Sequence, residues 1–200
     1  MRIIFLDIDG VMNSVDTTLA FSGGGLNRKK RLDPVSIGLL KKLCDETNAK
    51  IVISSTWRLG RTIQDFIDIF STYNWKDAPV IGKTVVLNYK GRTRGDEIQC
   101  WIEENNVQEY VILDDDSDML QSQKHRFVHV SNVNGFRSKH YCQCLRLFGM
   151  PDDRLEHQVN WVRKDALIEA SNRVVDALQN MTDEELIESL ERCGGGDASN

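Results

Sequence analysis

Residues 2–10 have the sequence RIIFLDIDG, and this stretch determines how the rest of the chain is interpreted. The run from residue 2 to residue 6 is short, apolar and rich in isoleucine, which is typical of a buried β-strand. Asp7 and Asp9 come directly after it. Because the chain turns beyond the end of a strand, both carboxylates can reach the same pocket. The stretch therefore predicts a strand that delivers two acidic groups to a site.

The rest of the first 150 residues alternates between strand-like and helix-like segments. Four further apolar runs predict strands at 51–53, 85–87, 110–113 and 127–130. Capping residues or apolar residues at helical spacing predict helices after Asp33-Pro34, after Thr62, around 98–102 and over 138–148. Residues 10–32 have poor periodicity and contain three consecutive glycines, so we expect a loop or flap there. The alternation predicts an α/β fold, a Rossmann-like parallel sheet flanked by helices.

In such sheets, ligands bind beyond the carboxyl ends of the strands. Three predicted strands are followed by carboxylates, hydroxyls or an arginine: Asp7 and Asp9, then Ser54, Ser55 and Arg58, then the acidic run DDDSD at 114–118. Three separate strand ends thus direct polar groups to one edge of the sheet. This convergence predicts a functional site there.

The residue types at these strand ends suggest a chemistry. Carboxylates that gather in one place repel one another unless a cation neutralises them, and a few oxygen ligands favour Mg²⁺. Asp7 can act as a nucleophile through an aspartyl-phosphate, and Asp9 can protonate the leaving oxygen and later activate water. The Ser54 hydroxyl can hydrogen-bond the transferring phosphoryl group, and Arg94 can offset its charge. The pattern predicts Mg²⁺-dependent hydrolysis of phosphate monoesters.

Several segments together resemble the haloacid dehalogenase (HAD) superfamily of phosphatases. Residues 5–11 (FLDIDGV) resemble its first motif, Ile53-Ser54 its second, and residues 113–118 (LDDDSD) its acidic fourth motif. Three further segments are similar to one small branch, which includes phosphatase domains of multifunctional RNA-repair proteins: SSTWR at 54–58, RGDEI at 94–98 before Trp101, and NGF at 134–136. The resemblance covers about residues 1–150.

The resemblance implies a role for each matching residue. Asp7 would be the nucleophile and a metal ligand. Asp9 would be the acid/base and would bind the metal through its backbone carbonyl. Asp114 would be the remaining carboxylate on Mg²⁺, with Asp115 and Asp118 in support.

The third motif departs from the family. A lysine is usual there, whereas the best-placed cation in this chain is Arg94, with Arg92 and Lys90 as nearby alternatives. Arginine carries the required charge, but its planar fork binds differently from an ammonium group.

The remaining predicted substrate contacts are Gly10, Ser55 and Arg58. Each segment also has a simpler interpretation. Ser55 and Thr56 can cap a helix, Arg58 can belong to an ion pair, and at least one carboxylate at 115, 116 or 118 is expected to be a solvated turn residue. At the level of function, the alternative to an enzyme is a switch module that accepts phosphate without turnover, similar in layout to a receiver domain.

The composition limits the possible classes of protein. A net charge of −5 over 200 residues argues against a dedicated duplex-DNA binder. The five cysteines include no CxxC pair, so we expect reduced thiols in a cytoplasmic protein. No apolar run has the length of a membrane span. The basic run at 28–31 could attract a polyanion, so the expected substrate is a phosphorylated small molecule, a nucleotide or a nucleic-acid end.

The chain is predicted to form a phosphatase domain over residues 1–150 and a helical extension with a frayed end over 151–200. The segments 10–33 and 58–94 are too short for the large cap domains that often select substrates in this superfamily. We therefore expect a minimal cap or none, and a site open to bulky substrates.

Overall fold

The computed structural model describes residues 1–21, 31–87 and 89–150, together with Thr182. The chain divides into two compact units, Met1–Asp152 and Asp153–Asn200. The predicted C-terminal helices and basic residues 28–30 lie outside the described residues. Within the described part, no helix is both long enough and apolar enough to cross a membrane.

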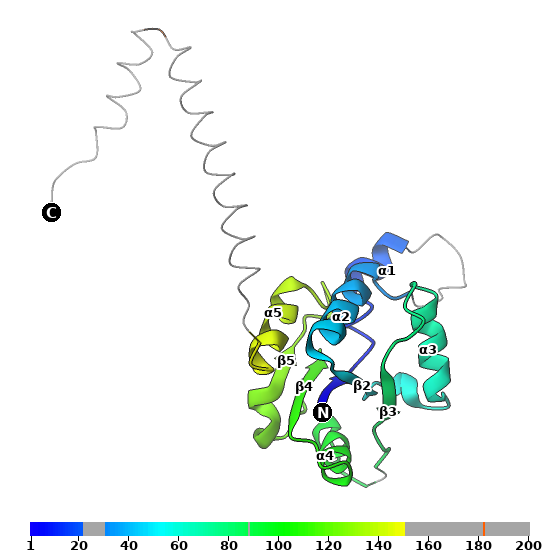
Figure 1. Cartoon of the computed structure of the whole chain (residues 1–200), viewed down its shortest axis with the longest axis vertical. Helices are drawn as coiled ribbons and strands as arrows, with labels where there is room; N and C mark the ends of the chain where they lie inside the picture. Colours follow the sequence, from blue (N-terminus) through cyan, green and yellow to red (C-terminus); the bar gives the residue numbers. More distant parts are fainter. Residues whose placement is uncertain (22–30, 88, 151–181, 183–200) are drawn as a thin grey trace, which may run out of the picture. The chain divides into compact units, whose positions relative to one another are not determined.

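A parallel sheet forms the centre of the first unit (Figure 1). Its strands are β1 (Arg2–Leu6), β2 (Lys50–Ile53), β3 (Val80–Lys83), β4 (Glu109–Asp114) and β5 (Phe127–His129). Their spatial order is β3-β2-β1-β4-β5, and all neighbouring pairs are parallel. Leu6 at the end of β1 pairs with both Ile53 and Leu113, so three carboxyl ends finish level with one another.

The helices flank this sheet, which confirms the predicted α/β fold. They are α1 (Val15–Phe21), α2 (Pro34–Thr47), α3 (Ile63–Ser71), α4 (Arg94–Glu104) and α5 (Ser138–Leu147), with short 3-10 turns η1 (Thr56–Arg58) and η2 (Gln121–Arg126). Two predicted helix starts are confirmed by their caps. The Asp33 carboxylate accepts a hydrogen bond from Val35 N at 2.8 Å, and Thr62 forms a capping box with Asp65.

The core forms because alternate residues of a strand point to opposite faces of the sheet. Ile3 and Phe5 face α4, where they join a buried cluster with Ile98 and Trp101. The Phe5 and Trp101 rings meet edge to face with centroids 5.6 Å apart. The residues between them in β1 point to the other face, where α2 and α5 contact each other (Figure 1). With both faces covered, β1 is fully buried from Ile3 to Leu6, and it holds Asp7 at the centre of the sheet.

One predicted strand is wrong. Residues 85–87 are not a strand, and the edge strand is instead β3, a few residues earlier. The apolar run at 85–87 gave the stronger sequence signal, but Val86 is exposed. In β3, Gly82 leaves room for the Trp101 indole, because a Cβ there would lie 3.2 Å from its Nε1 atom. Packing against Trp101 of α4 therefore places the edge strand at β3, although β3 has a weaker strand propensity than residues 85–87.

The segment predicted as a loop at 10–32 contains helix α1. The glycine run at 23–25 had favoured a loop for the whole segment. The Ser14 hydroxyl accepts a hydrogen bond from Thr17 N at 3.1 Å and so satisfies one amide of its first turn. The loop before α1 is braced by the segment after β5. Phe136 N donates to Val11 O at 2.8 Å, and Gly135, with φ +74°, allows the close approach. The 134–136 segment therefore supports the loop that follows Asp7.

Candidate active site

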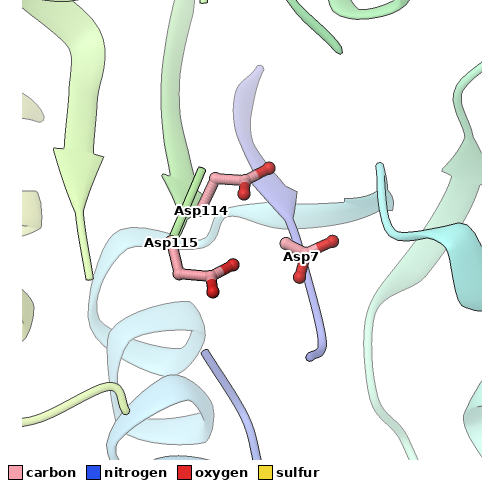
Figure 2. Close-up of side chains that lie close together, drawn as sticks. All are labelled: Asp7, Asp114 and Asp115. Carbon is pink, nitrogen blue, oxygen red and sulfur yellow. The ribbon is translucent and has the colours of Figure 1, made fainter. Parts of the chain in front are cut away.

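Three neighbouring strand ends place polar side chains at one edge of the sheet. Sheet hydrogen bonding continues one residue beyond β1 and β2, since Asp7 N donates to Leu113 O at 2.9 Å and Ser54 N to Leu6 O at 3.0 Å. Asp114 is the last residue of β4. Figure 2 shows Asp7, Asp114 and Asp115 side by side at these ends. The structure thus brings together groups that are more than a hundred residues apart in the chain.

The three carboxylates Asp7, Asp114 and Asp115 form a cluster suited to a cation. One oxygen from each lies within 4.8 Å of the others. Asp114 is 1% exposed, and its Oδ1 accepts a hydrogen bond from Asp116 N at 2.9 Å, whereas its buried Oδ2 has no hydrogen-bond partner. A buried carboxylate oxygen without a donor is unfavourable unless a cation meets it. This donor set of hard oxygens fits Mg²⁺.

Burial sets the protonation of this cluster. It raises the pKa of Asp7 to about 6, against the opposing effects of Arg94 and a hydrogen bond from Ser55. Burial, with the nearby charge of Asp7, raises the pKa of Asp114 to about 7. Burial also raises the pKa of Asp115. Without a cation, the cluster therefore holds protons at pH values where ordinary aspartates are ionised.

Among the described residues, Arg94 is the cation that contacts the carboxylate cluster. It is the first residue of α4, and its Nη1 donates to Asp7 Oδ1 at 3.1 Å and also to the Ser54 carbonyl. The same nitrogen lies 3.9 Å from Asp114 Oδ2. The alternative Arg92 instead pairs with Glu97, at 3.5 Å, and donates to Leu87 O. The geometry therefore favours Arg94 for the third-motif cation.

Asp118 does not fit the predicted metal role. It is outside the cluster of three carboxylates found among the described residues. Its Oδ2 accepts a hydrogen bond from Arg94 N at 2.9 Å, and its carbonyl accepts one from Gly95 N at 3.3 Å. Both bonds satisfy amides at the beginning of α4. Asp118 thus holds the helix that carries Arg94.

Asp9 lies beyond Asp7, partly exposed, with its side chain outside the carboxylate cluster. Its Oδ1 accepts a hydrogen bond from Asn13 Nδ2 at 2.8 Å. A carboxyl two residues from Asp7 but outside the carboxylate cluster is suited to proton transfer. Binding of the metal through the Asp9 carbonyl stays a prediction.

Gly10 occupies a position that no other residue can fill without strain. Its φ is +77°, and a Cβ there would lie 2.2 Å from Asp115 Oδ2. The missing side chain therefore lets the Asp115 carboxylate reach the cluster. This steric role follows from the short distance between Gly10 and the Asp115 side chain, whereas the predicted contact of Gly10 with substrate stays a prediction.

Gly10→Ala is expected to weaken Mg²⁺ binding by displacing Asp115, in addition to destabilising the backbone by about 1–2 kcal/mol. The measurement is the rise in melting temperature across a Mg²⁺ titration. Gly149→Ala is the matched control, because Gly149 also has positive φ, at +68°, but a Cβ there meets nothing within 4 Å. Equal Mg²⁺ responses in the two variants would show that Asp115 does not depend on the space at Gly10.

The two serines after β2 differ in their contacts. The Ser54 hydroxyl is buried and has no hydrogen-bond partner, so it retains its capacity to donate to a phosphoryl oxygen. Ser55 hydrogen-bonds Asp7, and its hydroxyl also accepts from Trp57 N at 3.4 Å as the cap of η1. The capping interpretation of Ser55 is therefore correct, and the same side chain also contacts Asp7.

Arg58 does not fit the predicted role as a phosphate ligand. It is 5% exposed, and all five of its N–H groups are used within the protein. Four go to the carbonyls of Ser54, Ser55, Thr84 and Val85, and the fifth goes to Glu97 Oε2. Glu97 is itself buried. The alternative, an ion pair, is what the structure shows, and Arg58 thus holds the Ser54-Ser55 loop against α4.

Arg58→Met is expected to lower the free energy of unfolding by about 3–5 kcal/mol, because Glu97 loses its buried ion-pair partner and keeps only the longer ion pair with exposed Arg92. Urea denaturation measures this loss. Arg58→Met/Glu97→Met should be more stable than the single variant, since both charges are then removed. The exposed pair Lys41–Asp45, 3.0 Å apart, gives the comparison, and Lys41→Met should cost less than about 1 kcal/mol. A double variant as unstable as Arg58→Met would instead assign the loss to the carbonyl contacts.

Sequence reasoning assigned no role to three residues that touch the site: Asn13, Glu97 and His129. His129, at the end of β5, has its Nε2 3.0 Å from Asp115 O. Glu97 accepts a hydrogen bond from Arg58, and Asn13 donates one to Asp9. Asn13 follows Asp9 by four residues in a loop, and an asparagine at such a position is a known turn signal. The contact of Glu97 depends on packing between α4 and the Ser54-Ser55 loop, which no local pattern indicates.

Comparison with known families agrees with this arrangement. A family model described as "HAD domain in Swiss Army Knife RNA repair proteins" matches residues 3–141. A search of curated proteins gives no match. The matched range covers more than half of the chain and contains Asp7, Ser54, Arg94 and Asp114. The chain therefore belongs to the family of HAD domains found in Swiss Army Knife RNA repair proteins.

Proposed function

We propose that this domain is a phosphatase that hydrolyses phosphate monoesters through an aspartyl-phosphate on Asp7. The observation that carries the proposal is the contact between Arg94 and Asp7, beside the Ser54 hydroxyl and the Asp114–Asp115 pair. One edge of the sheet thus combines a nucleophile, a hydroxyl that can donate a hydrogen bond to phosphate, a fixed cation and metal-binding carboxylates. Membership of the HAD family supports a hydrolase of this class.

Each residue has a separate role in the proposed reaction. Asp7 attacks phosphorus, and Asp9 gives a proton to the departing oxygen. Ser54 and Arg94 hold the phosphoryl oxygens. Asp7, Asp114 and Asp115 would hold Mg²⁺, which supplies charge neutralisation for the phosphoryl group. Asp9 then takes a proton from water as the water attacks the aspartyl-phosphate, which releases phosphate and restores Asp7.

The class of substrate is part of the proposal. We place a nucleotide or a nucleic-acid end ahead of a small sugar phosphate. Three exposed cations follow β2 and β3 in the chain: Arg61, Lys90 and Arg92. They could meet further phosphates of a polyanion, and such binding should weaken steeply with salt. The family also occurs in RNA-repair proteins, which supports the same class.

Turnover of an activated ester tests the proposed function. The purified protein with Mg²⁺ is assayed against p-nitrophenyl phosphate, sugar phosphates, nucleotides, and oligonucleotides with 5′- or 3′-phosphate ends. Multiple turnovers support a phosphatase, and the ester with the highest kcat/KM identifies the class of substrate. Stable labelling of Asp7 without turnover would overturn the proposal in favour of a switch module.

The pKa values of the cluster give a prediction for metal binding. Folding raises the pKa of Asp7 and Asp114 to about 6 and 7, so the folded protein binds more protons than the unfolded chain between pH 3.8 and those values. Without metal, the stability that these protons provide is lost as pH rises through that window. Mg²⁺ requires the ionised carboxylates. A fixed concentration of Mg²⁺ should therefore stabilise the protein more at about pH 8 than at about pH 5.

Differential scanning fluorimetry with and without Mg²⁺ measures this difference. For a protein of this size, each additional 1 kcal/mol should appear as about 2–4 °C. In Asp114→Asn, the dependence on pH should shrink, because one titrating ligand is gone. Equal stabilisation at both pH values in the unmodified protein would contradict a metal site built on these carboxyls.

A further inference from the structure

Asn13 makes two side-chain hydrogen bonds, one to the proposed acid/base Asp9 and one to the neighbouring Gly10. It is 8% exposed, in the loop after β1. Its Nδ2 donates to Asp9 Oδ1 at 2.8 Å, and its Oδ1 accepts from Gly10 N at 3.0 Å. Only the amide nitrogen can donate and only the amide oxygen can accept here, so the two partners fix the orientation of the amide.

The backbone that carries Asn13 is held by other parts of the protein. Ile8 O accepts from Met12 N at 2.8 Å and from Asn13 N at 3.2 Å, which closes a tight turn. Met12 O accepts from Asp33 N at 2.7 Å, at the beginning of α2. The segment after β5 holds the neighbouring Val11 carbonyl, as described above. These backbone hydrogen bonds fix the position of the Asn13 amide, and the amide in turn holds the Asp9 side chain through its hydrogen bond to Oδ1.

We propose that Asn13 is a positioning residue that orients the Asp9 carboxyl for proton transfer to the leaving group. This inference rests on the proposed phosphatase function. Because Oδ1 of Asp9 accepts a hydrogen from the amide, a proton held by this carboxyl sits on Oδ2. Asn13 thus sets which oxygen carries the proton and restricts the rotation of the side chain.

The step that depends on this orientation is departure of the alcohol. The Asp7 oxygen forms a bond to phosphorus while the bond from phosphorus to the ester oxygen breaks. The proton passes from Asp9 Oδ2 to that ester oxygen, so a neutral alcohol leaves and Asp9 becomes a carboxylate. An alkoxide is a poor leaving group without this proton, whereas nitrophenolate leaves as a stable anion. The need for Asp9 therefore varies with the leaving group.

The test compares kcat/KM for p-nitrophenyl phosphate and an alkyl phosphate of similar size, such as 2-phenylethyl phosphate. This parameter includes departure of the alcohol and no later step. Asn13→Asp keeps an oxygen for Gly10 N but offers no amide hydrogen to Asp9. We expect its kcat/KM to fall roughly tenfold or more for the alkyl ester and less than about threefold for the aryl ester. Asn13→Ala should show the same selective loss.

Two further variants separate positioning from a structural effect. In Asp9→Asn, the added Asn13→Asp change should cause no further selective loss on the alkyl ester, because the group that it positions is gone. Gln64→Glu is the matched control, since Gln64 also donates an amide hydrogen to an aspartate four residues away, Asp68, at 2.8 Å on exposed α3. It should leave both esters unaffected. Melting temperatures show that each variant is folded.

The outcomes separate this inference from the proposed function. Equal losses on the two esters in the Asn13 variants, with an active unmodified protein, would overturn the positioning role and leave the phosphatase intact. An unmodified protein that hydrolyses neither ester would overturn the proposed function and this inference with it.

Discussion

Asp7→Asn is expected to lower turnover of any phosphate ester by roughly four orders of magnitude or more, because an amide cannot form the aspartyl-phosphate. Asparagine has nearly the same shape as aspartate and still offers an oxygen to the Arg94 guanidinium. The fold should therefore survive. The measurement is kcat for the purified variant, with circular dichroism and a melting curve on the same sample. The variant should also take up no label from a phosphate donor.

A second asparagine variant controls for the general effect of the substitution. Asp116→Asn alters a neighbouring acid whose Oδ1 accepts from Ser117 N and which is outside the carboxylate cluster. It should retain turnover within about threefold, as expected for an exposed turn residue. Substantial activity in a folded Asp7→Asn protein would exclude Asp7 as the nucleophile.

Asp114→Asn is expected to raise the Mg²⁺ concentration for half-maximal activity roughly a hundredfold or more. Groups that only support metal ligands already contribute about 10–100-fold to affinity, and Asp114 offers a ligand oxygen itself. The neutral amide also removes a charge that balances the cation. Activity is measured across a Mg²⁺ series after treatment with chelator, and partial recovery at high Mg²⁺ is expected.

Chelator alone provides the complementary test on the unmodified protein. Activity should vanish in excess chelator and return when Mg²⁺ exceeds it. Full activity in excess chelator would contradict a metal-dependent reaction. An unchanged Mg²⁺ requirement in Asp114→Asn would instead place the metal away from this carboxylate.

Most of the sheet could be predicted from the sequence, because buried parallel strands are nearly continuous apolar runs. The strand predicted at 2–6 is β1, and those predicted at 51–53 and 110–113 are each within one residue of β2 and β4 at either end. The edge strand β3 was missed, because Gly82 weakens its pattern and only contact with Trp101 explains it. Local patterns therefore predicted the centre of the sheet better than its edge.

The site was predictable where a residue's place follows from a strand end, and less so where it depends on partners. The sequence predicted that Asp7, Ser54 and Asp114 would meet. It assigned Arg58 to substrate and Asp118 to metal, because both are polar and close to motif residues. The structure turns both toward protein atoms: Arg58 toward carbonyls and Glu97, and Asp118 toward the amides of α4. Such partners come from elements distant in the sequence, so spacing alone could not indicate them.

The level ends of β1, β2 and β4 have a consequence for which parts of the chain can change length. Side chains alternate between the faces of a strand, so a single inserted residue in β1 would shift everything beyond it by about 3.3 Å and reverse its direction. Asp7 would then no longer face the residues that follow Leu113 and Ile53. Insertions between strands, by contrast, leave the pairing of Leu6 unchanged. Lineages of this domain should therefore vary in length between these three strands and keep a constant number of residues within them.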